Sequence, residues 1–170
     1  MIEEVEGIII NERPYGETSK VINVLTKQYG IIGMMVKGCR TMKSPLRSVT
    51  GKLTYGKFYI YYKKDKLSLL SEVNIINNFS NIKKDIDKIS YAAFLLVLSE
   101  QVYRQQPNDN IYNLLIDGLI KINDNYDSLV ITNIIELKFL DFLGVLPVLD
   151  SCAVCGTQND IITLHKELRL

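Results

Sequence analysis

The hydrophobic pattern of this 170-residue chain changes its period once, near Phe79, and that change limits the folds it can adopt. Before Phe79, short runs of β-branched and aromatic residues alternate with turns, which is typical of β-strands. After Phe79, apolar residues recur at the spacing of a helical face. Because the two patterns do not interleave, the sequence predicts an all-β domain followed by an all-α domain.

Five strands are expected in the first part of the chain. They cover residues 6–11, 20–25, 31–37, 53–62 and 67–76. Pro14 and Gly16 mark a turn after the first strand, Gly30 separates the second from the third, and the polar residues 38–51 form a long loop. Five short strands with one long loop fit a small Greek-key barrel such as the OB-fold, and an SH3-like barrel fits the pattern as well.

Three helices are expected in the second part. The apolar stripe of the first continues to about Arg104 and comprises Ile82, Ile86, Ile89, Ala93 and Leu96. Pro107 ends this helix, and Asn108 or Asp109 caps the second. Asp127 or Ser128 caps the third. Short connections predict that the three helices pack against one another.

The charge distribution is more informative than the net charge of +1. Residues 1–80 hold 12 lysines and arginines against 7 acidic residues, whereas residues 81–151 hold 6 against 10. A basic half followed by an acidic half predicts two modules with different partners. The chain shows no apolar run of the roughly 18 residues that a membrane span needs. Its N-terminus lacks a signal pattern, and three cysteines are a poor disulfide framework, so a cytoplasmic, reduced protein is expected.

A stretch near the C-terminus combines the end of a very apolar helix with a stop and a pair of thiols. It reads ELKFLDFLGVLPVLDSCAVCG from Glu136 to Gly156, with Gly144 as the helix C-cap. The stretch resembles the signature of the RecO family of bacterial recombination and DNA repair proteins. Earlier pieces resemble the family in the same order, namely Tyr15-Gly16-Glu17, Thr26, Gly30, Gly33, Lys37-Gly38-Cys39-Arg40 and Lys43-Ser44-x-Leu46.

This chain departs from the family pattern in two places. Lys52-Leu53 stands where the family often has a Pro-aromatic pair, and the family's second CxxC, with the helices after it, is absent. The resemblance implies an OB-fold at residues 1–79, a helical domain at residues 80–150 and part of a zinc finger at residues 151–170.

The resemblance also implies a function. A RecO-type recombination mediator binds single- and double-stranded DNA, anneals complementary strands and helps RecA load onto strands coated by single-strand-binding protein. RecR is the implied working partner, the tail of single-strand-binding protein is expected to dock on the helical domain, and the implied location is the bacterial cytoplasm at the nucleoid. The alternatives are an RNA-binding or ribosome-associated OB module, and a degenerate fragment that binds nothing.

A basic and aromatic segment between Lys37 and Lys66 is the expected nucleic-acid site. Single-strand binders combine cations for phosphates with aromatic faces for bases. The strand period places Tyr55, Tyr59 and Tyr61 on one face and Phe58 and Tyr62 on the other. The residues expected to bind are Lys37, Arg40, Lys43, Arg47, Lys52, Lys57, Tyr59 and Tyr61. From the residues alone, a solvated basic loop beside an aromatic core is an equal alternative, and the resemblance favours DNA.

Cys152 and Cys155 are spaced to bind one zinc ion, and a tetrahedral site needs two further ligands. Only His165 follows them, so the site is expected to be incomplete, and two reduced thiols are the favoured alternative. A homodimer through the apolar tail, with a shared zinc site, stays open. A redox role is disfavoured because no βαβ pattern flanks the pair. Since no nucleophile, P-loop or metalloprotease motif occurs, no enzyme is expected.

Overall fold

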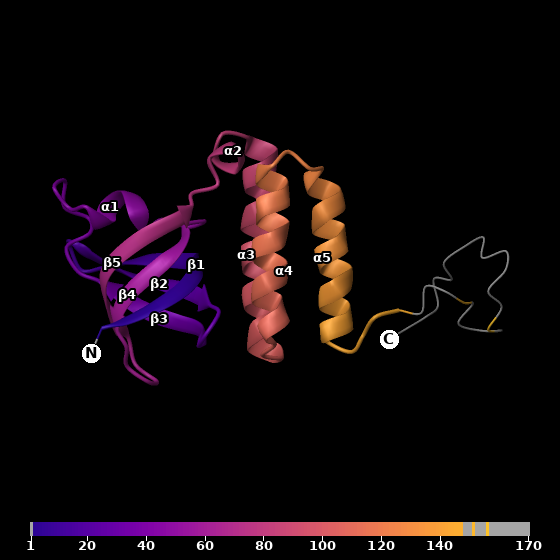
Figure 1. The fold of residues 1–170 in the computed structure, drawn as a ribbon, viewed down its shortest axis with the longest axis horizontal. Helices are drawn as coiled ribbons and strands as arrows, with labels where there is room; N and C mark the ends of the chain where they lie inside the picture. The colour runs from indigo at the N-terminus through magenta and orange to yellow at the C-terminus, as the bar shows by residue number, and fades with distance from the viewer. Residues whose placement is uncertain (1, 148–150, 152–155, 157–170) are drawn as a thin grey trace.

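The computed structural model describes residues 2–147, Ser151 and Gly156, and it consists of a β-barrel followed by a helical domain (Figure 1). The strands are β1 (Glu3–Tyr15), β2 (Ser19–Thr26), β3 (Gly30–Val36), β4 (Tyr55–Tyr61) and β5 (Ser68–Asn77). The helices are α1 (Leu46–Val49), α2 (Ser80–Lys83), α3 (Ile86–Gln105), α4 (Asp109–Asn123) and α5 (Ser128–Phe142). The short helix α1 lies in the expected long loop. The predicted order of an all-β and an all-α domain is confirmed.

The barrel closes in the order β1-β2-β3-β5-β4. Neighbouring strands are antiparallel except β3 and β5, which run parallel and pair only through Met34 with Ser68 and Met35 with Leu69. This five-stranded closed barrel is OB-like, which decides between the two barrels that the sequence pattern allowed. The short β3–β5 pairing leaves the first half of β3 without a strand on that side in the described part of the chain.

Strand β1 is buried on both faces from Gly7 to Ile10, which explains its continuous apolar run there. Ile9 belongs to the barrel interior together with Phe58 and Ile60. Ile8 and Ile10 belong instead to a second core, which the outer face of the barrel shares with α3 and α4. The helical domain is therefore packed on the barrel through apolar side chains of both, rather than linked to it by a free tether.

The helices begin where side-chain caps are available. The carboxylate of Asp85 accepts hydrogen bonds from the backbone N–H groups of Asp87 and Lys88. Asn108 caps α4 and Asp127 caps α5 with their side chains, which selects one of the two candidates that the sequence offered for each helix.

The predicted stripe of the first helix is wrong in part. The chain forms α2 and ends it at Lys83, and α3 then starts anew after Asp85, so Ile82 and the later residues are out of phase. Ile86 is consequently 78% exposed, and Ala93 is exposed too. The buried residues of α3 are Ala92, Leu95, Leu96, Ser99 and Val102.

Helices α3 and α4 lie between the barrel and α5 (Figure 1). Gly118 lets α4 and α5 approach closely, because a Cβ atom there would lie 2.3 Å from Cδ1 of Ile135. Gly144 follows α5 with a φ of 71°, as expected for a C-cap. In the described residues, no helix combines the length and the apolar character of a bilayer-spanning segment. Cys152, Cys155 and most of the tail at 151–170 lie outside the described residues.

Candidate nucleic-acid interface

The loop between β3 and β4 carries five of the expected cations at one end of the barrel. Cys39, Leu46 and Val49 pack against the barrel interior, so the apolar residues of the loop hold it in place. The cations Lys37, Arg40, Lys43, Arg47 and Lys52 are all exposed. None of the five forms an ion pair with a carboxylate among the described residues. Their charges are therefore available to an anionic ligand.

Arg40 fixes this loop to the turn between β1 and β2. Its backbone N–H donates to the carbonyl of Thr18 over 2.8 Å, and its guanidinium Nη1 donates to the carbonyl of Gly16 over 3.1 Å. The remaining guanidinium donors can still meet a phosphate, since arginine has five. These two hydrogen bonds give the loop a defined position beside the turn between β1 and β2.

Arg40 also lines a small cleft of about 210 Å³, together with Glu12, Arg13, Pro14 and Lys20. The ammonium of Lys20 lies 2.6 Å from a carboxylate oxygen of Glu12, so these two charges compensate each other. Arg13 and Arg40 leave the cleft positive. The sequence analysis missed Arg13 because it treated the segment around Pro14 as a turn. Arg13 lies in β1, and the pairing of β1 with β2 brings it to the basic loop.

The outer face of β4 carries the expected side chains, but two of them are already engaged. Gly56, Phe58 and Ile60 are buried, so the predicted alternation is confirmed. Lys57 Nζ lies 2.7 Å from one carboxylate oxygen of Glu4.

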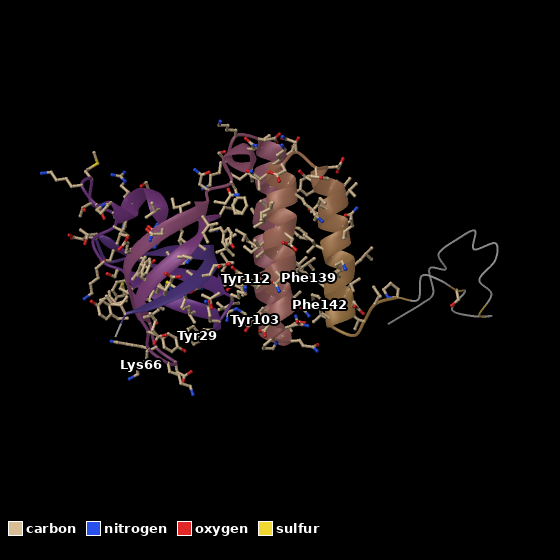
Figure 2. All side chains as sticks on the ribbon, viewed as in Figure 1. Tyr29, Lys66, Tyr103, Tyr112, Phe139 and Phe142 are labelled. Atoms are coloured by element: carbon tan, nitrogen blue, oxygen red, sulfur yellow. The ribbon has the colours of Figure 1, made fainter. Side chains whose placement is uncertain are left out.

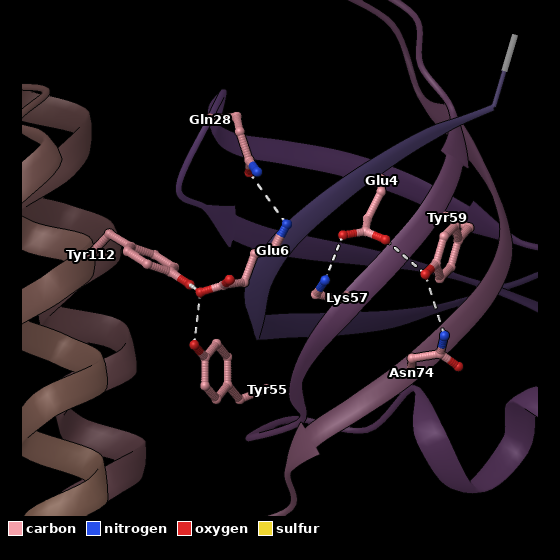
Figure 3. A network of polar contacts seen from close by, with 8 residues as sticks. All are labelled: Glu4, Glu6, Gln28, Tyr55, Lys57, Tyr59, Asn74 and Tyr112. Carbon is pink, nitrogen blue, oxygen red and sulfur yellow. Dashed lines mark hydrogen bonds and ion pairs between the residues drawn. The ribbon is translucent and has the colours of Figure 1, made fainter.

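Tyr59 donates its hydroxyl over 2.7 Å to the other oxygen of Glu4 (Figure 3). These contacts, that of Lys57 first, lower the pKa of Glu4. A phosphate would have to compete with this carboxylate for both groups, whereas Tyr61 is 43% exposed and stays open.

At the other end of this face, Glu6 joins the barrel to the helical domain. Tyr55 and Tyr112 both donate to the same carboxylate oxygen of Glu6, over 2.7 and 2.8 Å (Figure 3). The hydrogen bond from Tyr55 is the main cause that lowers the pKa of Glu6, and burial is the main cause that raises the pKa of Tyr112. Because Tyr112 comes from α4, the helical domain covers this end of the β4 face.

We expect the Glu6 contacts to make stability depend on pH. A carboxyl whose pKa is lowered by folding stabilises the protein above its unfolded pKa of about 4.3, and this contribution is lost as pH falls through the folded value. Glu6→Gln should therefore lose about 1 kcal/mol at pH 7, and the difference from the parent chain should shrink below pH 4. Urea unfolding at both pH values measures it. Glu17→Gln, in an exposed turn, is the control, and an equal loss in both variants would contradict the assignment.

The fold divides the basic stretch 37–66 between two places. In Figure 1 the loop with α1 lies at the upper edge of the barrel and the β4–β5 hairpin at its lower edge. Figure 2 shows Tyr29 and Lys66 at this lower edge. Tyr62, expected on the same face of β4 as Phe58, is half-buried and stacks on Tyr29 with ring centroids 4.5 Å apart. Sequence reasoning missed Tyr29, although an aromatic residue in the polar turn before Gly30 was a usable signal.

The described residues contain no group of three or more histidine, cysteine, aspartate or glutamate side chains that could hold a metal ion. Cys39 is only 1% exposed and belongs to the barrel interior, so it is not placed to serve as a ligand at the surface. The expected pair Cys152 and Cys155 falls outside the described residues.

Comparisons with known proteins agree with the two-domain organisation. Residues 1–79 match the family described as Recombination protein O N terminal, and residues 83–167 match Recombination protein O C terminal. The chain is 35% identical over 156 residues to a protein named DNA repair protein RecO from Listeria monocytogenes serotype 4b, covering 91% of this chain and 61% of the relative.

Two further relatives carry the same name. The one from Exiguobacterium sibiricum is 31% identical over 158 residues, covering 92% of this chain and 63% of the relative. The one from Bacillus velezensis is 32% identical over 170 residues, covering 99% and 66%. The chain thus spans between 61% and 66% of the length of these relatives.

Proposed function

Since the chain belongs to the RecO family of DNA repair proteins, we propose that it acts as a recombination mediator and binds single- and double-stranded DNA through its barrel. In this role it anneals complementary strands and helps RecA load onto strands coated by single-strand-binding protein, with RecR as working partner. The observation that carries the proposal is the loop of five exposed cations on an OB-like barrel, none of which pairs with a carboxylate of residues 2–147.

The loop suits a ligand that is recognised by its backbone. Lys37, Arg40, Lys43, Arg47 and Lys52 offer exposed charge to phosphates, which favours binding with little sequence preference. A mediator of this kind works by holding strands rather than by bond chemistry, and it acts in the bacterial cytoplasm at the nucleoid.

The helical domain offers a separate surface for a protein partner. A groove of about 470 Å³ between α3 and α5 is lined mainly by apolar side chains, among them Leu98, Val102, Leu137 and Leu140. Such a groove suits the apolar residues of a peptide. We propose that the tail of single-strand-binding protein docks on this domain, which leaves the barrel free for DNA.

Strand annealing tests the proposed function. Two complementary labelled DNA oligonucleotides should anneal faster with the purified chain than without it, whereas a pair without complementarity should not respond. Binding of RNA with no acceleration of DNA annealing would favour the alternative, an RNA-binding or ribosome-associated OB module. Failure to bind either nucleic acid would remove both functions.

Zinc binding is proposed only as a partial or shared site. Cys152 and Cys155 supply two thiolates and His165 one imidazole, whereas a structural zinc site takes four ligands, so a further ligand has to join them. Metal analysis should find less than one tightly held zinc per monomer. One zinc per dimer, with dissociation of the dimer in chelator, would indicate a shared site. One zinc held tightly by each monomer would contradict the ligand count.

A further inference from the structure

An open pocket lies where the barrel closes least completely. Strands β3 and β5 pair only through Met34 with Ser68 and Met35 with Leu69, so the β4–β5 hairpin diverges from the first half of β3. The space between them is a pocket of about 450 Å³, lined by residues that include Tyr29, Gly33, Tyr62, Lys63, Lys66 and Leu67.

The pocket presents aromatic surface to solvent. The rings of Tyr29 and Tyr62 stack at 4.5 Å with 16° between their planes, and Tyr29 is 44% exposed. The hydroxyl of Tyr29 donates to a carboxylate oxygen of Glu3 over 2.9 Å, which fixes the ring and raises the pKa of the phenol. The pair is therefore a fixed, neutral platform rather than two freely rotating side chains.

Cations lie beside this platform. Lys63 and Lys66 are exposed, and neither has a carboxylate within ion-pair distance among the residues that the structure describes. Asp65 is the one carboxylate among the described residues that line the pocket, and it occupies the left-handed turn of the hairpin with a φ of 57°. Two lysines against one aspartate leave the pocket with net positive charge.

Gly33 leaves room beside β3 for the side chain of Leu67 from the hairpin. A Cβ atom there would lie 2.8 Å from Cδ2 of Leu67, so a larger residue would push Leu67 away. The contact sets the width of the pocket.

We propose that Tyr29, Tyr62, Lys63 and Lys66 form a subsite for one unpaired nucleobase and its neighbouring phosphate in a single strand. The base stacks on the tyrosine pair, and the lysines contact the phosphate. Stacking tolerates any sequence, because every base has a π-face. Bases inside a duplex have no free face, so this subsite selects single strands, while the loop with Arg40, Lys43 and Arg47 serves strands of either kind. The inference rests on the proposed function, because it takes DNA as the ligand of the barrel.

The test compares two single-stranded probes of equal charge. One is a labelled oligothymidylate and the other an oligonucleotide of the same length with abasic sites throughout. The parent chain should prefer the thymidylate probe by about tenfold in fluorescence anisotropy titrations. Tyr29→Ala combined with Tyr62→Ala should remove this preference, whereas the double Phe variant should keep it. Tyr126→Ala, which removes a tyrosine 61% exposed on the helical domain, is the matched control.

The outcomes separate the subsite from the proposed function. Because the preference is a ratio within one preparation, partial unfolding of a variant leaves it unchanged. Equal affinity of the parent chain for both probes, or an undiminished preference in the double Ala variant, would overturn the subsite and leave DNA binding in place. A parent chain that binds neither probe would overturn the proposed function as well.

Discussion

Replacing Arg40, Lys43 and Arg47 together with glutamate should weaken DNA binding by about a hundredfold or more at 0.1 M salt. Each phosphate contact contributes about 0.7 to 0.9 log units of affinity per log unit of salt, and three contacts are removed while three repulsive charges are added. The dependence of affinity on salt should therefore become flatter by about two to three log units per log unit. Single strands and duplexes should lose affinity alike, because both present phosphates.

Anisotropy titrations at several salt concentrations measure both quantities. The matched control is the triple variant of Lys84, Lys121 and Lys138 to glutamate, which makes the same change of charge at exposed positions of the helical domain. This control should keep most of the affinity, since only the long-range part of the charge change acts on the barrel, and salt screens it. Equal losses in the two triple variants would show that net charge, and not the loop, governs binding.

Gly30→Ala should lower the free energy of unfolding by about 2–4 kcal/mol, because two costs act together. Gly30 has a φ of 65°, a conformation that disfavours a side chain. An added Cβ would also lie 2.0 Å from the hydroxyl oxygen of Tyr103, which reaches the β2–β3 turn from α3. The substitution thus strains a turn of the barrel and disturbs its packing with the helical domain.

Two comparisons separate these costs in urea unfolding. Gly16→Ala makes the same change at a φ of 59°, where an added Cβ meets no atom within 4 Å, so it should show the conformational cost alone. The double variant Gly30→Ala/Tyr103→Ala should lose less unfolding free energy than the two single variants lose in sum, because the double variant lacks the ring that an added Cβ would meet. Equal losses in Gly30→Ala and Gly16→Ala would mean that the close approach of Tyr103 adds no cost to the substitution.

Much of the fold could be predicted because local signals determine it. The caps Asp127 and Asn108, the stop at Gly144 and the alternation along β4 all act within a few residues. The phase of α3 could not be predicted in the same way. It depends on where α2 ends and Asp85 starts a new helix, and a break of that kind is hidden inside a continuous apolar pattern.

The candidate site could be predicted only in part, because its composition is local and its geometry is not. The loop cations were identified, and they are exposed as expected. Glu4 lies opposite Tyr59 in the register of β1 against β4, and this register brings its carboxylate to Tyr59 and Lys57. The closure of the barrel places the β3–β4 loop and the β4–β5 hairpin with Lys63 at different edges (Figure 1). Neither relation is readable from neighbouring residues.

Annealing of complementary DNA strands already coated with single-strand-binding protein tests the role of mediator most directly. Coating blocks spontaneous pairing, so a protein that only binds bare DNA has no effect on it. The chain should accelerate this annealing several-fold, and the triple variant of Arg40, Lys43 and Arg47 should not. Acceleration on bare strands but none on coated strands would contradict the role of mediator and reduce the chain to a DNA-binding module.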